Sequence, residues 1–96
     1  MNIMITNNQC AERFEITHDG SMAILEYITM SGQMTLVHTE VPKELGGKGF
    51  GGQLVKFALE HAKRNNLIVV AHCEFAQSYL SRHKEYSPIL SQDQDK

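Results

Sequence analysis

A cluster of glycines between a strand-like run and a helix-like run is the feature that most limits the folds open to this chain. Five glycines fall within seven residues: Gly46, Gly47, Gly49, Gly51 and Gly52. The run before them, MTLVHTEV (34–41), favours a strand, and Pro42 ends it because proline cannot donate to a sheet ladder. The run after them, FGGQLVKFALEHAKRN from Phe50, repeats its apolar residues at the helical period. We therefore expect a strand, a glycine-rich turn and an amphipathic helix in succession.

The next apolar run completes a strand–helix–strand unit. LIVVAHC (67–73) is nearly continuous in apolar residues, which is typical of a strand buried on both faces. A helical crossover between two strands of one sheet makes them parallel. Segments 34–41 and 67–73 are therefore predicted to pair in parallel.

The N-terminal half predicts an antiparallel meander. AERFEIT (11–17) and MAILEYIT (22–29) favour strands, and the turn signals HDGS and MSGQ separate them from each other and from 34–41. Residues 1–9 are weakly patterned. FAQSYLSRH (75–83) predicts a short helix, and 91–96 a disordered tail. The predicted fold is one α/β domain of the α+β type over 1–96, in which a three-strand antiparallel meander precedes the parallel crossover and a short C-terminal helix.

Composition narrows the function classes. The chain has 96 residues, a net charge of -2 and no basic block, which argues against a nucleic-acid partner. No apolar run is long enough for a membrane span, and the first residues do not resemble a signal peptide. Cys10 and Cys73 fit no metal spacing and are too few for a disulfide framework. The sequence thus predicts a cytoplasmic protein without a metal site.

The glycines admit a functional and a structural interpretation. Glycines before a helix let a phosphate approach its unpaired N–H groups, but they can equally serve a plain turn. A P-loop is excluded because Gly49 stands where a hydroxyl residue should follow Lys48. The dinucleotide fingerprint matches literally from Gly47 to Gly52, yet that fold needs two mononucleotide halves and this chain has one strand–helix–strand unit.

A third family fits the order of the elements. HTEVPKELGGKGFGGQLVKFALEHAK followed by CEFAQSYLSRHKEY resembles the minimal single-domain members of the GNAT N-acetyltransferase superfamily over residues 10–88. The family pattern (Q/R)-x-x-G-x-(G/A) departs at its first position, where this chain has Gly46. The resemblance implies acetyl-CoA as cofactor, with pantetheine along strand 34–41. The implied cofactor-binding residues are Glu40, Val41, Gly47, Lys48, Gly49, Phe50, Gly51 and Gly52.

Five residues are candidates for the chemistry that the resemblance implies: His38, Glu40, His72, Cys73 and Tyr79. His38 and Glu40 lie two apart on one strand and should share a face, although a structural histidine and a solvated glutamate are the plain alternatives. Cys73 ends the apolar strand just before a helix, where it could carry an acetyl group or simply line the cleft. Tyr79 lies on the last helix, where larger members of the superfamily often keep a tyrosine as general acid.

Three functions follow from these residues. The first is acetyl transfer to an amine acceptor, a small molecule or a protein, that the sequence does not identify. The second is a CoA- or acyl-CoA-binding module with little or no turnover. The third is a small interaction domain in which the glycines serve only the turn. The sequence does not predict the oligomeric state.

Overall fold

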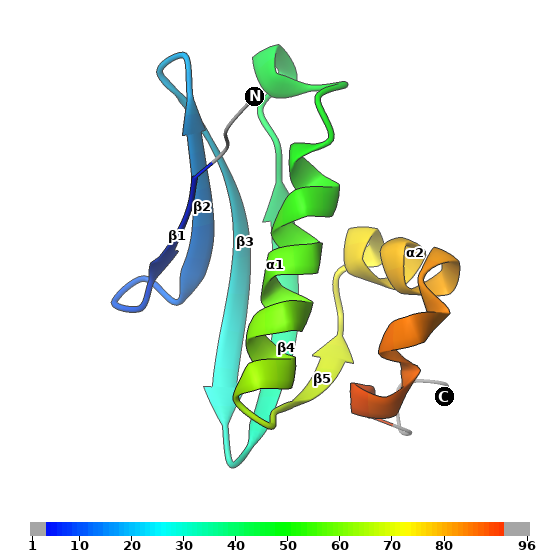
Figure 1. The fold of residues 1–96 in the computed structure, drawn as a ribbon. Helices are drawn as coiled ribbons and strands as arrows, with labels where there is room; N and C mark the ends of the chain where they lie inside the picture. The colour runs from blue at the N-terminus through cyan, green and yellow to red at the C-terminus, as the bar shows by residue number, and fades with distance from the viewer. Residues whose placement is uncertain (1–3, 92–96) are drawn as a thin grey trace.

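The computed structural model describes residues 4–91, and they form one five-stranded mixed sheet with helices against it (Figure 1). The strands follow one another across the sheet in chain order. They are β1 (Ile5–Asn8), β2 (Arg13–His18), β3 (Ser21–Met30), β4 (Gln33–Glu40) and β5 (Ile68–Ala71). The helices are α1 (Phe50–Arg64) and α2 (Glu74–Arg82), with short 3-10 turns η1 (Lys43–Leu45) and η2 (Lys84–Ile89). The predicted mixed α+β fold class is confirmed.

The predicted crossover is confirmed, but one prediction about its second strand is wrong. β4 and β5 pair in parallel, from Gln33 with Ile68 to Leu36 with Ala71. The apolar run 67–73 was expected to be buried on both faces. Instead β5 is an edge strand of four residues, and the Ile68 side chain is 42% exposed. The apolar residues of β5 that point away from the helices therefore lie on an uncovered face of the sheet and are not packed under a second layer.

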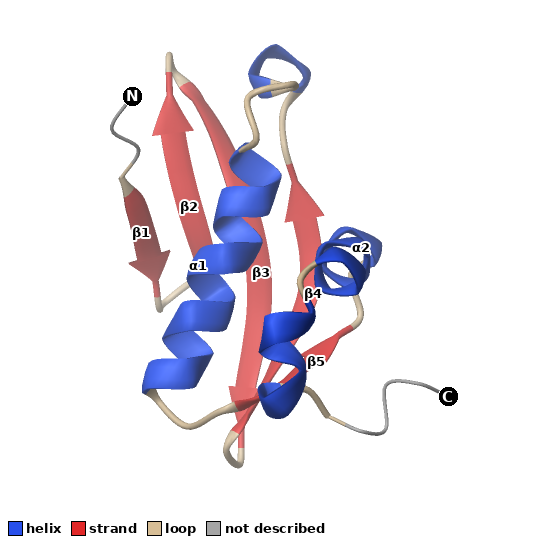
Figure 2. Cartoon of the chain, turned by 45° about the vertical axis from the view of Figure 1, so that its right-hand side comes forward, coloured by secondary structure: helices blue, strands red, loops and turns tan. Residues whose placement is uncertain are grey.

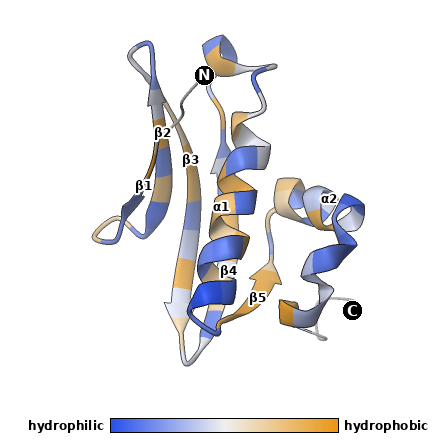
Figure 3. Ribbon diagram, in the orientation of Figure 1, coloured by the Kyte–Doolittle hydropathy of each residue, from blue (hydrophilic) through white to orange (hydrophobic). Residues whose placement is uncertain are grey.

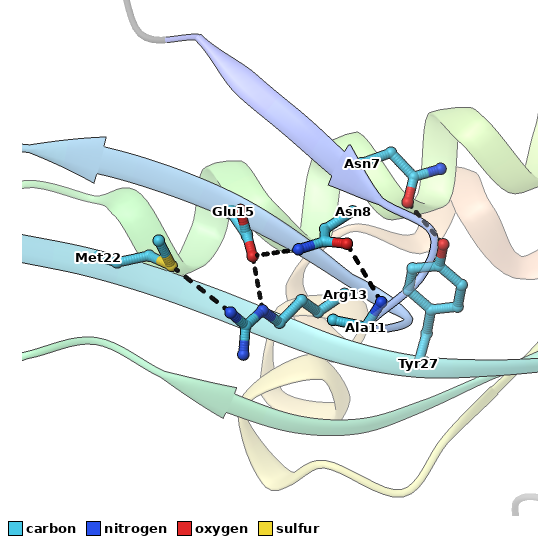
Figure 4. Close-up of polar contacts among 7 residues, drawn as sticks. All are labelled: Asn7, Asn8, Ala11, Arg13, Glu15, Met22 and Tyr27. Carbon is cyan, nitrogen blue, oxygen red and sulfur yellow. Dashed lines mark hydrogen bonds and ion pairs between the residues drawn. The ribbon is translucent and has the colours of Figure 1, made fainter.

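The antiparallel part has one strand more than the sequence predicted. β1 pairs with β2 from Ile5 with Ile16 to Asn8 with Arg13. Polar side chains hold it in place (Figure 4): the Asn8 amide and the Arg13 guanidinium both donate to Glu15, and the Tyr27 hydroxyl donates to Asn7. A strand held by such pairs has little of the apolar alternation on which the prediction relied.

The other predicted strands and helices begin or end a few residues away from their predicted bounds. Ala11 and Glu12 belong to the turn before β2, where Glu12 has a positive φ of 54°. The last helix covers Glu74–Arg82 rather than 75–83. Ser91 donates its N–H to the Val69 carbonyl, whereas residues 92–96 of the predicted tail lie outside the described residues.

Both helices lie on the same face of the sheet (Figures 1 and 2). Apolar residues of α1, including Leu54, Val55 and Leu59, are fully buried against Phe14 and Leu25 of the sheet. Figure 3 shows the corresponding division of α1 into an apolar and a hydrophilic side. No helix or strand within residues 4–91 covers the opposite face of the sheet.

A β-bulge in β4 changes which side chains face the helices. Leu36 pairs with Tyr27 and His38 pairs with Glu26, so Val37 is the extra residue. Before the bulge, the even-numbered Leu36 is buried on the helix side; after it, Thr39 pairs with the buried Leu25. His38 consequently points to the uncovered face. Bulges of this kind often re-aim side chains next to functional sites.

Stability should fall at acid pH because of His61 on α1. Burial against Phe14, 5.6 Å away between ring centres, lowers the pKa of His61, and the charge of Arg64 lowers it further. The unfolded chain, with an ordinary histidine pKa of about 6.5, takes up the proton first, so this contribution to stability is lost as the pH falls below that value. The melting temperature should therefore drop between about pH 7.5 and pH 5.5. The drop should be smaller in His61→Leu, and an unchanged drop would contradict the assignment.

Candidate functional site

The two parallel strands separate towards their C-terminal ends and leave a cavity between them. Their ladder ends at Leu36 and Ala71, where the Leu36 carbonyl accepts the N–H groups of His72 and Cys73. β4 continues to Glu40 while the chain after β5 turns away into α2, as Figure 2 shows. The cavity has a volume of about 560 Å³. Its lining residues are Val37, His38, Thr39, His72, Cys73, Glu74 and Phe75.

Cys73 and Thr39 meet across this gap on the helix side of the sheet. The Cys73 Sγ and the Thr39 Oγ1 are 3.0 Å apart, within hydrogen-bonding distance. Cys73 is 8% exposed and forms the N-cap residue of α2, whose Gln77 N–H donates to the Cys73 carbonyl. The thiol therefore lies at a helix N-terminus, beside a hydroxyl and at the wall of the cavity.

His38 lines the same cavity from the uncovered face, and Glu40 lies beside it. The His38 Nε2 lies 3.3 Å from the Glu40 Oε1, and both side chains are more than half exposed. They share a face, as the sequence predicted. His72 also lines the cavity and is exposed, whereas its neighbour Cys73 is buried. The cavity thus has imidazoles towards one face of the sheet and the thiol towards the other.

The glycine loop leads into a helix N-terminus that has no side-chain cap. Gly47 and Gly49 both have φ of 78°, a conformation that other residues adopt only with strain. Gly49 is the N-cap residue of α1, and the Gln53 N–H is the first to bond back, to the Gly49 carbonyl. The amides of Phe50, Gly51 and Gly52 therefore lack intrahelical partners. No acidic residue stands in the first turn of α1, and Lys48 is exposed.

Gly51 has a packing role beside the predicted binding role. A Cβ on Gly51 would lie 2.5 Å from the Cζ of Phe75, and a Cβ on Gly52 would lie 3.7 Å from the Tyr79 ring. Both aromatic residues belong to α2. Gly51 thus lets α2 approach the first turn of α1 closely, whereas a Cβ at Gly52 would make an ordinary contact. Phe75 lies between that turn and the cavity.

Tyr79 is buried beside α1 rather than in the lining of the cavity. Its ring stacks on His83 with 3.9 Å between ring centres, and the His83 Nδ1 lies 2.8 Å from the Tyr79 carbonyl oxygen. Burial raises the pKa of the Tyr79 phenol, and the nearby Glu85 carboxylate raises it further. The phenol is therefore protonated at neutral pH. Its predicted part as a general acid stays a prediction.

Sequence reasoning did not identify Thr39 and Phe75 as cavity residues. Strand alternation alone puts Thr39 on the face opposite Leu36, and only the bulge at Val37 brings it to the helix side. Phe75 looks in the sequence like an ordinary apolar residue of an amphipathic helix. Gly51, on the preceding helix, indicates a close contact but does not identify Phe75 as the partner.

Comparisons with known proteins agree with this arrangement. A sequence profile described as GCN5-related N-acetyl-transferase matches residues 13–89. The solution NMR structure of a GCN5-like putative N-acetyltransferase from Staphylococcus aureus is similar to this chain, with 32% sequence identity and a TM-score of 0.74. That match covers 94% of this chain and 89% of the other. No curated protein matches. The chain belongs to the GCN5-related N-acetyltransferase family.

Proposed function

We propose that this protein transfers an acetyl group from acetyl-CoA to an amine acceptor. The observation that carries the proposal is that the end of β4, unpaired on its β5 side, borders a cavity lined by a thiol and an imidazole, and that Phe75 in the wall of this cavity lies against the uncapped first turn of α1 at Gly51.

The residues present fit acetyl-CoA. The free amides of Phe50, Gly51 and Gly52, with the glycine loop and Lys48, would hold the pyrophosphate, since helix N-termini bind phosphates readily. A Cβ added at Gly47 or Gly49 would meet no protein atom within 4 Å, so the loop leaves room on that side. The β4 backbone near Glu40 and Val41 would hold the pantetheine arm. When bound, acetyl-CoA supplies the activated acetyl thioester.

On the amine side, we assign proton removal to His38. The neutral amine forms a bond to the acetyl carbon, the carbon–sulfur bond of the thioester breaks, and the amine loses one proton to the His38 ring. Glu40, 3.3 Å from His38, would orient the ring and stabilise its positive charge. The exposure of both side chains supports access for an acceptor from the uncovered face.

On the thiol side, Cys73 has two roles open to it. It can take the acetyl group first, as a thioester, and pass it to the amine. Alternatively it lines the cleft next to the departing CoA sulfur, which takes up one proton; the Thr39 hydroxyl and the protonated Tyr79 phenol are candidate donors. The proximity of Cys73 to Thr39 supports either role.

Mass spectrometry of the protein after exposure to acetyl-CoA distinguishes the two roles. If Cys73 carries the acetyl group, digestion should yield a Cys73 peptide with one added acetyl group, and Cys73→Ala should lower kcat by at least about 100-fold. The exposed Cys10 supplies an internal control, because incidental acetylation would modify it first. An unmodified Cys73 with a normal rate in Cys73→Ala would assign the residue to the cleft lining.

The second candidate function is a CoA- or acyl-CoA-binding module, which Gly46 at the usual Gln/Arg position favours. Calorimetry with CoA tests the shared step, and a panel of amines tests turnover. Absence of binding at millimolar CoA would overturn both functions, while binding without turnover of any amine would leave only the binding module.

Within the described residues, no helix is both long and apolar enough to cross a membrane. We propose the cytoplasm as location, which suits the free thiols of Cys10 and Cys73.

A further inference from the structure

The uncovered sheet face is organised around the proposed catalytic histidine. The strand registers place Arg13, Glu26 and His38 in one row across β2, β3 and β4. The next row towards the end of β4 contains Ile24 and Glu40. Two carboxylates therefore flank His38 on the open face. The Glu26 carboxylate makes no hydrogen bond or ion pair with any residue in the described part of the chain, although it is half-buried.

On the other side of His38, the same face is apolar. We call the set Ile28, Met30, Ile68 and Val70 the apolar patch. Thr35 on β4 lies between two members of the apolar patch, because it pairs with Ile28 on β3 and with Val70 on β5. The Ile28 side chain is 46% exposed and Met30 is 70% exposed. Large apolar side chains gathered on a flat face favour contact with another molecule.

The cavity connects this face with the proposed acetyl-CoA site. Its lining includes His38 and His72 from the uncovered side and Thr39 and Cys73 from the helix side. An acceptor that reaches the cavity from the uncovered face would lie over the sheet and would not need to pass the helices. A small amine would occupy only the positions around His38, between Glu26 and Glu40, and would leave the apolar patch unused.

We propose that this face binds the acceptor as an extended, lysine-bearing segment of a protein. The lysine ammonium is attracted by Glu26 and Glu40 and releases one proton to solvent, and the neutral amine then gives its second proton to His38 as the amide bond forms. A neighbouring aliphatic side chain of the segment covers the apolar patch. Thr35 and His38 are the β4 partners of Ile28 and Glu26, which lie only two residues apart on β3 because Val37 is the extra residue of the bulge. Side chains two positions apart on an extended segment point to the same side, about 7 Å from each other, so the preferred acceptor has an aliphatic residue two positions from its lysine. This inference rests on the proposed acetyltransferase function.

Three acceptors test it: n-butylamine, a pentapeptide with a central lysine and leucine at both ends, and the same peptide with serine at both ends. Each is incubated with the full chain and acetyl-CoA, and kcat/KM is measured. The leucine peptide should exceed the serine peptide by at least about tenfold, since burying a leucine contributes that much. In the double variant Ile28→Thr/Ile68→Thr, the preference should fall to about twofold or less, with butylamine unaffected.

Met22→Thr is the matched control. Met22 is 39% exposed on the same strand and face as Ile28, but it lies beyond Glu40 on the side away from the patch. This variant should keep the full leucine preference. Equal use of both peptides, with butylamine acetylated, would overturn the inference and leave the proposed function standing. If no amine is acetylated, the proposed function and this inference are both overturned. A dimer in solution that the Ile28→Thr/Ile68→Thr variant dissociates would also overturn the inference, because a second copy of the chain would then cover the face.

Discussion

His38→Ala is expected to lower kcat/KM for an amine acceptor by about 10² to 10⁴, because a positioned general base contributes that much. The loss should appear in kcat, while the affinity for CoA stays within about twofold, since the ring contacts the amine side of the cavity and not the glycine loop. Stopped-flow or coupled-assay rates, together with calorimetric CoA affinities of the same preparations, provide the two measurements.

Two further variants separate catalysis from positioning. Glu40→Gln should show an intermediate loss, because the amide can still hold the ring but cannot stabilise its charge. Lys56→Ala, an exposed change on α1, should match the parent. A His38→Ala variant with parental kcat would remove His38 from the mechanism.

The order of elements could be predicted from the sequence because each one has a local signal. The change from alternation to the helical period at the glycines predicted the β4–α1–β5 crossover, and the structure has it in parallel register. β1 was missed because its pairing relies on polar side chains such as Asn8 rather than on an apolar stripe. β5 was predicted to be buried on both faces because an apolar run looks the same in the sequence whether the sheet face is covered or open.

The sequence predicts the candidate site less completely than the fold. His38 and Glu40 were expected to share a face, but which face they share depends on the bulge at Val37, and no residue type in the sequence indicates that bulge. The same bulge brings Thr39 to Cys73. The sequence analysis assigned one role to the whole glycine cluster. In the structure, Gly47 and Gly49 have positive φ, whereas Gly51 lies in close contact with α2.

That division leads to the second large effect, at the glycine loop. Gly49→Ala should weaken CoA binding by at least about tenfold, because an alanine at φ of 78° is strained by about 1–2 kcal/mol and the loop relaxes away from the geometry that presents the amides of Phe50 and Gly51. A charge-assisted bond from such an amide to a phosphate contributes about 1.5–3 kcal/mol, so a small rotation of the first turn is costly. Calorimetric titration with CoA measures the change.

Gly32→Ala distinguishes this effect from a general loss of stability. Gly32 also has φ of 78° and open space around its Cα, but it lies in the β3–β4 turn, at the opposite end of β4 from the glycine loop. Both variants should therefore lose similar stability in urea, about 1–2 kcal/mol, from the same backbone strain. Only Gly49→Ala should lose affinity for CoA. Equal affinities in the two variants would mean that the loop serves the turn alone, whereas a selective loss at Gly49 would support the N-terminus of α1 as the phosphate site.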